Sequence, residues 1–341
     1  MGSDGEETIV ERAHARVGLL GNPSDQYFGK CLAVSLENFR ATVTLTPSRG
    51  AAIEIEDDRA DGGGRRLLES LVKVFEEYLG DRLPPRSRGF VLSYASDIPY
   101  QLGLAGSSAI ICAGLRCLMR WFHEVDIPKP ILPNLVLKAE TDLGIVAGYM
   151  DRVIQVYSSA VFMDFSKEVF ESNGHGGYEA VDPALLPSDL WLMLQREGAT
   201  HKEAASGCSS QIHSSVRQRW IDAEVEVHDG MREFARIAER GREIILSGRG
   251  LGDPFAALMR ANFALRRKLF GDAVLGRSNL AMVAIAESHG AAAKFCGSGG
   301  AILVYCPQGS DQAGAIETEC NAKGYAFCKV RVAEQTTWDW K

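Results

Sequence analysis

The chain has 341 residues and a net charge of −7, and 46% of its residues are hydrophobic while 24% are charged. Its length predicts two domains, and its composition is that of an ordinary globular protein. The negative charge argues against nucleic-acid or membrane-surface partners, and no apolar run reaches the roughly 18–20 residues needed to cross a bilayer.

Eight cysteines are spread through the chain without a C-x-x-C pair, and most have apolar neighbours. This distribution indicates free thiols in a reducing compartment, so we expect a cytoplasmic protein. No histidines stand at zinc-ligand spacing. The acidic N-terminus lacks the apolar core of a signal peptide.

In chain order, residues 1–12 are polar and predict a disordered leader. Alternating apolar and polar residues then predict several strands, and an amphipathic helix over 67–79 is closed by Gly80. The strands of this part are expected at 15–21, 31–36, 41–47, 51–56 and 90–99.

A helix is predicted from about residue 106 to 125, and two more follow over 133–145 and 148–161. The stretch 189–195 is the last strand expected in the first half. Beyond it we expect helices at 216–241, 253–271 and about 310–322, a helix end near 291–295, and strands at 301–307 and 325–332. This mixed order predicts an α+β fold with domains at 13–200 and 201–341.

The most informative stretch is PYQLGLAGSSA at 99–109, which leads into the helix. Glycines let a phosphate approach the backbone, and the free amides of a helix start attract an anion. Ser108 would lie in the first turn, where its hydroxyl can reach a phosphate-bound Mg²⁺ ion. On local grounds alone, an N-cap serine after a flexible turn explains the stretch equally well.

Two further stretches favour phosphate binding, ARVGLLGNPSDQYFGK at 15–30 and AAAKFCGSGGAILVY at 291–305. In this order the three stretches resemble the motifs of the GHMP kinases, which include galactokinase and mevalonate kinase. The resemblance covers residues 15–335. Within the family it is closest to the plant glucuronokinases, through segments such as DLGIVAGYMDRVIQVY, MDFSKE and SVRQRW.

The resemblance implies a two-domain α+β fold, with a left-handed βαβ unit in the N-terminal domain and a ferredoxin-like C-terminal domain. It also implies ATP and Mg²⁺ as cofactors and a small sugar acid as substrate. The ATP-binding loop would comprise Pro99, Gly103, Leu104, Ala105, Gly106, Ser107, Ser108 and Ala109.

The resemblance further implies that Ser108 and Glu140 bind the metal, and that Asp151 accepts the proton of the attacking hydroxyl. Arg16 matches the basic residue that pairs with this aspartate. Without the resemblance, Glu140 would be taken for a solvated helix residue and Arg16 for an ordinary strand residue.

For the substrate, the resemblance implies Asn22 and Asp25 in the first motif and Gly297, Ser298 and Gly299 in the third. Locally, Asp25 is equally well explained as an Asx-turn residue. Galactokinases have a glutamate where this chain has Asn22. A glutamate about 4 Å from the carboxylate of a uronic acid would cost roughly 1–4 kcal/mol, and Asn22 removes that repulsion. Gly18 also departs from the family, which usually has asparagine there.

A substrate carboxylate needs a cationic partner, and an arginine gives two parallel hydrogen bonds. The second half offers five arginines, most of them expected on solvated helix faces. Our sequence prediction favours Arg217 or Arg219 because Trp220 beside them indicates a partly buried helix. The other three are Arg260, Arg266 and Arg267.

The resulting functional hypothesis is an ATP-dependent kinase that phosphorylates C1 of D-glucuronate for UDP-glucuronate formation. The alternatives are a related kinase for galacturonate, galactose or a heptose, and a sensor that binds nucleotide and sugar without turnover. A diphosphate decarboxylase of the same fold would need a basic cluster near the first motif, where Lys30 and Arg40 are the main cations.

Overall fold

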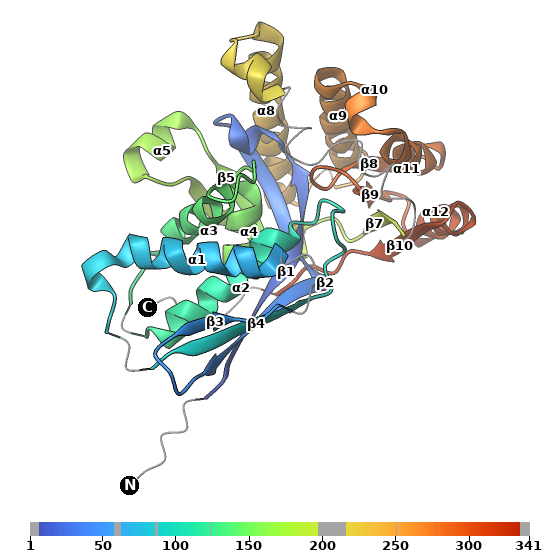
Figure 1. The fold of residues 1–341 in the computed structure, drawn as a ribbon. Coiled ribbons are helices and arrows are strands. Elements are labelled where there is room, and N and C mark those ends of the chain that lie inside the picture. The colour runs from blue at the N-terminus through green and yellow to red at the C-terminus, as the bar shows by residue number, and fades with distance from the viewer. Residues whose placement is uncertain are drawn as a thin grey trace.

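The structure is a computed structural model that describes residues 7–57, 63–85, 88–123, 125–196, 216–249 and 251–334. Within them the chain forms two mixed α and β parts, each built around its own sheet (Figure 1). The predicted α+β class is therefore confirmed. No helix of the described residues is both long and apolar enough to span a membrane.

The first sheet is organised by one long strand, β2. Its first half pairs with β5 and its second half with β4, both antiparallel, while β1 runs antiparallel along both halves. The register between β1 and β2 shifts after His14, where the two halves meet. The strands are β1 (Ile9–Leu20), β2 (Lys30–Pro47), β3 (Ile53–Ile55), β4 (Phe90–Ser96), β5 (Ala160–Asp164) and β6 (Gly177–Ala180).

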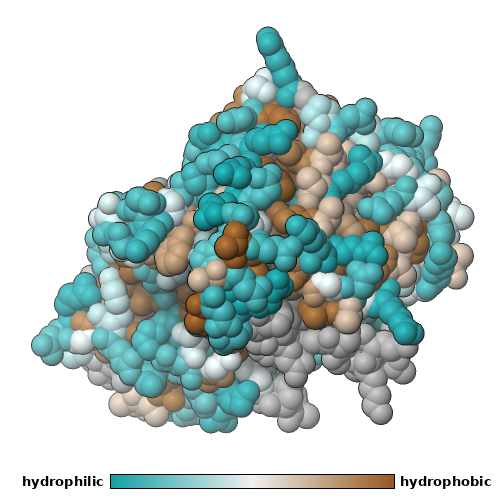
Figure 2. All heavy atoms as spheres, turned by 90° about the horizontal axis from the view of Figure 1, so that it is seen from above, coloured by the Kyte–Doolittle hydropathy of each residue, from teal (hydrophilic) through white to brown (hydrophobic). Residues whose placement is uncertain are grey.

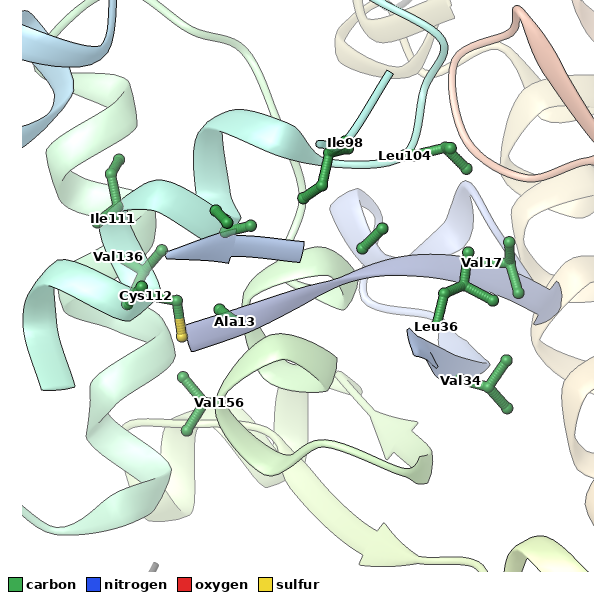
Figure 3. Close-up of a cluster of buried hydrophobic side chains, with 14 of the residues drawn as sticks. Ala13, Val17, Val34, Leu36, Ile98, Leu104, Ile111, Cys112, Val136 and Val156 are labelled. Carbon is green, nitrogen blue, oxygen red and sulfur yellow. The ribbon is translucent and has the colours of Figure 1, made fainter. Parts of the chain in front are cut away.

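Five helices accompany this sheet, and the nearly fully buried α2 lies at their centre. Its apolar side chains pack against β1, α3 and α4, as Ile111 and Cys112 do beside Val136 and Val156 (Figure 3). Strands β3 and β4 are parallel and are joined through α1. The helices are α1 (Gly63–Leu79), α2 (Gly106–Trp121), α3 (Leu132–Thr141), α4 (Met150–Tyr157) and α5 (Lys167–Asn173).

The second sheet is antiparallel and has the strand order β10-β7-β9-β8. In chain order this places the fourth, first, third and second strands side by side, which is the arrangement of a ferredoxin-like sheet. Its strands are β7 (Leu190–Gln195), β8 (Ala292–Phe295), β9 (Ala301–Tyr305) and β10 (Tyr325–Lys329), and its helices are α8 (Val225–Ser247), α9 (Asp253–Phe270), α10 (Asp272–Leu275), α11 (Arg277–Ser288) and α12 (Ser310–Ala322).

The structure differs from the predicted domain boundaries at both ends of the first domain. Strand β1 begins at Ile9, so the end of the predicted leader 1–12 is a paired strand. Strand β7 belongs to the second sheet, because its hydrogen-bonding partners are β9 and β10. The boundary therefore lies before β7 and not at residue 200. Such pairings join residues far apart in the sequence, which periodicity does not record.

Two predicted elements also change, and two strands are present that were not predicted. The expected helix end near 291–295 is the strand β8, which pairs with β9. The helix predicted over 216–241 is two helices, one over 216–221 and then α8, separated at Ala223, whose φ of 58° is left-handed. The strands β5 and β6 occupy a region that the sequence analysis left without strands.

Figure 2 shows a face dominated by polar and charged side chains with hydrophobic ones between them. The cysteines of the described residues are all free, and six of these seven are buried, as the apolar neighbours of each predicted.

Candidate active site

Arg16 of β1 is the centre of the candidate site. It is 4% exposed, and its guanidinium makes a bidentate pair with the Asp151 carboxylate of α4, with Nε–Oδ1 2.5 Å and Nη2–Oδ2 2.6 Å. Its third nitrogen, Nη1, donates to the Gly103 carbonyl at 2.6 Å. The bidentate geometry orients the carboxylate as well as balancing its charge.

The glycine-rich loop packs directly against Arg16 and enters α2. Gly103 and Ala105 both have left-handed φ values, 67° and 64°, and the helix begins at Gly106. The first amides of a helix have no intrahelical acceptor, so they are free to bind an anion. Gln155 of α4 fixes the turn, because its Nε2 donates to the Ala105 carbonyl at 2.9 Å.

The remaining loop residues have different surroundings. Leu104 is buried in the core (Figure 3), and its carbonyl accepts from the Arg16 amide at 3.3 Å. Pro99 is half-buried ahead of the loop, and Ala109 is buried in the first turn of α2. The sequence therefore predicted where the loop leads into α2, and the binding of ATP by this loop stays a prediction.

Both serines of the loop donate to Glu140 of α3, which is 0% exposed. Ser107 Oγ lies 2.7 Å from Oε1, and Ser108 Oγ lies 3.0 and 3.1 Å from the two carboxylate oxygens. Arg152 neutralises this buried carboxylate: its Nε donates to Oε2 at 2.6 Å and its Nη2 also pairs with it. Arg152 Nη1 lies 3.4 Å from the Asp151 carboxylate, so it links the two acids.

Ser108 and Glu140 suit a magnesium ion. A hydroxyl and a carboxylate are hard oxygen donors, and Mg²⁺ usually takes one or two protein ligands and fills its octahedron with water and phosphate oxygens. Among the described residues no group of three or more histidine, cysteine, aspartate or glutamate side chains forms a fuller metal site. The pair therefore fits a metal that arrives with a nucleotide.

Asp25 lies in the short helical turn between β1 and β2 and faces α4. The Met150 amide donates to its Oδ2 at 3.1 Å, and Gly148 packs so closely that a Cβ there would lie 1.9 Å from the same oxygen. Burial raises the pKa of Asp25 to about 6, and the nearby charge of Asp151 raises it further while Arg152 and Arg16 oppose the rise. The first motif and the Asp151 helix thus meet, as predicted.

The two departures from the family pattern in the first motif depend on each other. A Cβ on Gly18 would lie 2.8 Å from the Asn22 side chain, so a larger residue at 18 would displace Asn22. Asn22 is held by Lys294, whose Nζ donates to Asn22 Oδ1 at 2.8 Å and to the Gly18 carbonyl at 2.6 Å. Burial lowers the pKa of Lys294 to about 7. The sequence alone does not explain why this chain has glycine at position 18.

The third motif lies against the first two. A Cβ on Gly297 would lie 2.5 Å from the Gly103 carbonyl and 2.8 Å from Arg16 Nη2. A Cβ on Gly103 would in turn lie 2.6 Å from the Gly299 carbonyl oxygen and 3.1 Å from the Ser298 amide nitrogen. These residues remain predicted substrate contacts, and what the structure shows is their packing against the glycine-rich loop.

The five candidate arginines differ clearly in their exposure and partners. Arg217 is exposed, and Arg219 pairs with Glu224 and Glu226 on the surface, so the structure does not support the preference for these two. Arg260 and Arg267 also have surface partners, the Gly290 carbonyl and Asp272. Arg266 alone of the five is buried.

The sequence analysis missed Arg152, Gln155 and Lys294, all buried around the predicted residues. Arg152 directly follows Asp151, and a charged residue among apolar neighbours is a signal in itself. For Lys294 the signal is similar, since it is a cation inside the strand AAKF.

The chain is similar to known proteins over nearly its whole length. A family model described as GHMP kinases N terminal domain matches residues 66–159. Glucuronokinase 1 of Arabidopsis thaliana is 40% identical, and the match covers 97% of this chain and 94% of that protein. Probable glucuronokinase 2 of the same plant is 41% identical, with 94% and 90% covered.

Among solved structures, the galactokinase of Lactococcus lactis in complex with galactose superposes with a TM-score of 0.71 at 15% identity, covering 97% of this chain and 95% of that one. The phosphomevalonate kinase of Streptococcus pneumoniae gives a TM-score of 0.72 at 11% identity, with 96% and 99% covered. At these identities the likeness supports the fold alone.

The raised pKa of Asp25 predicts a pH-dependent stability difference between wild type and Asp25→Asn. The folded protein binds the Asp25 proton more tightly than the unfolded chain, so wild type loses stability as pH rises from about 4 to 6. Asparagine does not ionise. In urea unfolding, the free energy of unfolding of the variant, relative to that of wild type, should rise by up to about 3 kcal/mol between pH 4 and pH 7. The control is Asp229→Asn on the surface, and a pH-independent difference for Asp25→Asn would contradict the assignment.

A shared metal site predicts that Ser108→Ala and Glu140→Gln raise the Mg²⁺ requirement of ATP turnover by about tenfold or more. The two defects should be less than additive in a double-mutant cycle, because both remove a ligand of one ion. Glutamine keeps an acceptor for Arg152. Ser107→Ala is the matched control, with a smaller effect expected. Fully additive defects in a magnesium titration would count against a common site.

Proposed function

The chain belongs to the GHMP kinase family, and on that premise we propose that it transfers the γ-phosphate of ATP to the anomeric hydroxyl of D-glucuronate. The products are D-glucuronate 1-phosphate and ADP. We place the reaction in the cytoplasm, where the sugar phosphate can supply UDP-glucuronate formation.

The observation that carries the proposal is the Arg16–Asp151 pair beside the glycine-rich loop. Phosphoryl transfer needs mainly positioning and charge neutralisation. The loop amides would hold the phosphates, and the Arg16 cation lies between the loop carbonyl and the Asp151 carboxylate. The oxygen of the attacking hydroxyl bonds to the γ-phosphorus, and the bond to the β-phosphate oxygen breaks.

Asp151 would orient the attacking hydroxyl and receive its proton. Its carboxylate is engaged by Arg16 and lies near Arg152, and a weakly basic carboxylate suffices for a late proton transfer in a loose transition state. Ser108 and Glu140 would hold Mg²⁺. When bound, this ion would neutralise negative charge on the phosphates.

The sugar acid is supported by the names of the two plant relatives and by the first motif. Asn22 is neutral where galactokinases carry a glutamate, which removes a repulsion of roughly 1–4 kcal/mol toward a uronate carboxylate. The cation bound to Asn22, Lys294, further favours an anion on this side of the site. Asp25 would accept hydrogen bonds from sugar hydroxyls.

The alternatives have less support. A decarboxylase for a diphosphate has less support because Lys30 is paired with Asp164 and Glu239, and because the plant relatives that match nearly the whole chain are named glucuronokinases. A sensor without turnover does not need the Arg16–Asp151 pair together with Ser108 and Glu140. Kinases for galacturonate, galactose or a heptose share all these groups, so the choice of sugar rests on substrate measurements.

Asp151→Asn should lower turnover of ATP with D-glucuronate by about 10²–10⁴-fold, because the variant keeps the size of the side chain and loses the proton acceptor. ATP binding should stay close to that of wild type. The measurement is ADP release with D-glucuronate, D-galacturonate, D-galactose and D-glucose for both proteins. The matched control is the surface variant Asp229→Asn.

Two outcomes would refute this proposal. More than a tenth of wild-type turnover in Asp151→Asn, at saturating magnesium, would remove Asp151 from its role. If the wild-type protein prefers another sugar of the panel, that sugar replaces D-glucuronate as the proposed substrate.

A further inference from the structure

Arg266 of α9 is a buried cation for which the reaction described so far has no use. Arg266 is 2% exposed, and its Nε and Nη2 have no hydrogen-bond partner among the described residues. Leaving a buried guanidinium without an anion is costly, and carboxylates are its usual bidentate partners. The arrangement indicates a ligand that supplies the missing acceptor atoms.

The position of Arg266 is on the sugar side of the site. One helical turn earlier, Asn262 accepts from the Gly21 amide at 2.8 Å and donates to the Asn22 carbonyl at 3.3 Å. Residues four apart share a helix face, so Arg266 lies on the face of α9 that holds the first-motif turn. Its guanidinium carbon is 5.0 Å from the ring centre of Phe295, two residues before Gly297 of the third motif.

The charged groups that act on Arg266 belong to the candidate site. Burial lowers the pKa of Arg266 to about 10; the positive charge of Arg16 acts in the same direction, and Asp25 opposes it. Arg266 also helps to lower the pKa of Lys294, which donates to Asn22. Two buried cations therefore flank the turn that carries Asn22 and Asp25.

We infer that Arg266 binds the C6 carboxylate of the sugar acid through its Nε and Nη2, and so selects uronates over neutral sugars. This inference rests on the proposed function. A neutral sugar would leave the guanidinium without its anion, so selectivity comes from the unpaired charge as well as from the bonds to the carboxylate.

The phosphates of ATP are a weaker explanation for the same charge. They would lie at the glycine-rich loop and the start of α2, where Arg16 donates to Gly103. Arg266 lies on α9, a helix of the second sheet, and on the same helix face as Asn262, which is hydrogen-bonded to the first-motif turn. A sugar held by Asp25 brings a carboxylate to this side.

The test compares Arg266→Met with Arg267→Met, a neighbour on the same helix whose ion pair with Asp272 is on the surface. The substrates are D-glucuronate and D-glucuronamide, which differ only at C6, where the amide is neutral and has an NH₂ donor in place of one acceptor oxygen. Arg266→Met should lose about 30-fold or more in kcat/KM for D-glucuronate, much less for the amide, and nothing in KM for ATP. Arg267→Met should match wild type.

Thermal unfolding gives a readout that a merely structural role would not produce. Replacing a buried unpaired charge by an apolar side chain should leave the melting temperature of Arg266→Met unchanged or higher. D-glucuronate alone should raise the melting temperature of wild type and of Arg267→Met, but not of Arg266→Met.

The outcomes separate the two claims. Three results for Arg266→Met would overturn the role of Arg266 and leave the proposed function intact, provided that wild type turns over D-glucuronate. They are equal losses of kcat/KM on the acid and the amide, a raised KM for ATP only, and a strongly lowered melting temperature without ligand. A wild-type protein that neither turns over D-glucuronate nor is stabilised by it would overturn the proposed function, and this inference with it.

Discussion

The pairing of Arg16 with Asp151 is the interaction on which the rest of the site depends. It joins β1 to α4, and the same guanidinium donates to Gly103, so one side chain connects two sequence motifs. Gly297 of the third motif packs against it without room for a Cβ. The conformation of the glycine-rich loop, the position of the acid and the contact between the two sheets are therefore coupled. A change in any one of them is expected to alter the others.

Buried charge is distributed unevenly around this centre. Toward the glycine-rich loop, Glu140 is balanced by Arg152 and accepts from both serines. Toward the first-motif turn, the cations are Lys294 and Arg266, and the nearest acid, Asp25, has a raised pKa. The first side suits a metal with polyphosphate and the second suits an anionic sugar. Under the proposed function, these two charge environments would give the two substrates different places in one site.

The sequence predicted the parts of this site that are local and missed those that form over long distances. The glycine-rich loop and the start of α2 follow from composition, and the roles of Glu140 and Asp151 follow from resemblance. Lys294 was missed because its partners Gly18 and Asn22 are remote in the sequence, whereas the partners of Arg152, Glu140 and Gly148, lie within twelve residues of it. Strand β7 was predicted in the first domain because strand pairing leaves no local signal. Arg266 had a usable signal: it continues the buried stripe of α9 through Met259, Asn262 and Phe270, whereas Arg267 does not.

The central claim is that this site phosphorylates the anomeric oxygen of a sugar acid, and the position of the phosphate in the product tests it most directly. Incubation with ATP, Mg²⁺ and D-glucuronate carrying a carbon-13 label at C1 can be followed by phosphorus NMR. The account predicts one new phosphate ester signal that is split by coupling to the labelled carbon. A product signal without this splitting, or ADP release without any sugar phosphate, would contradict it.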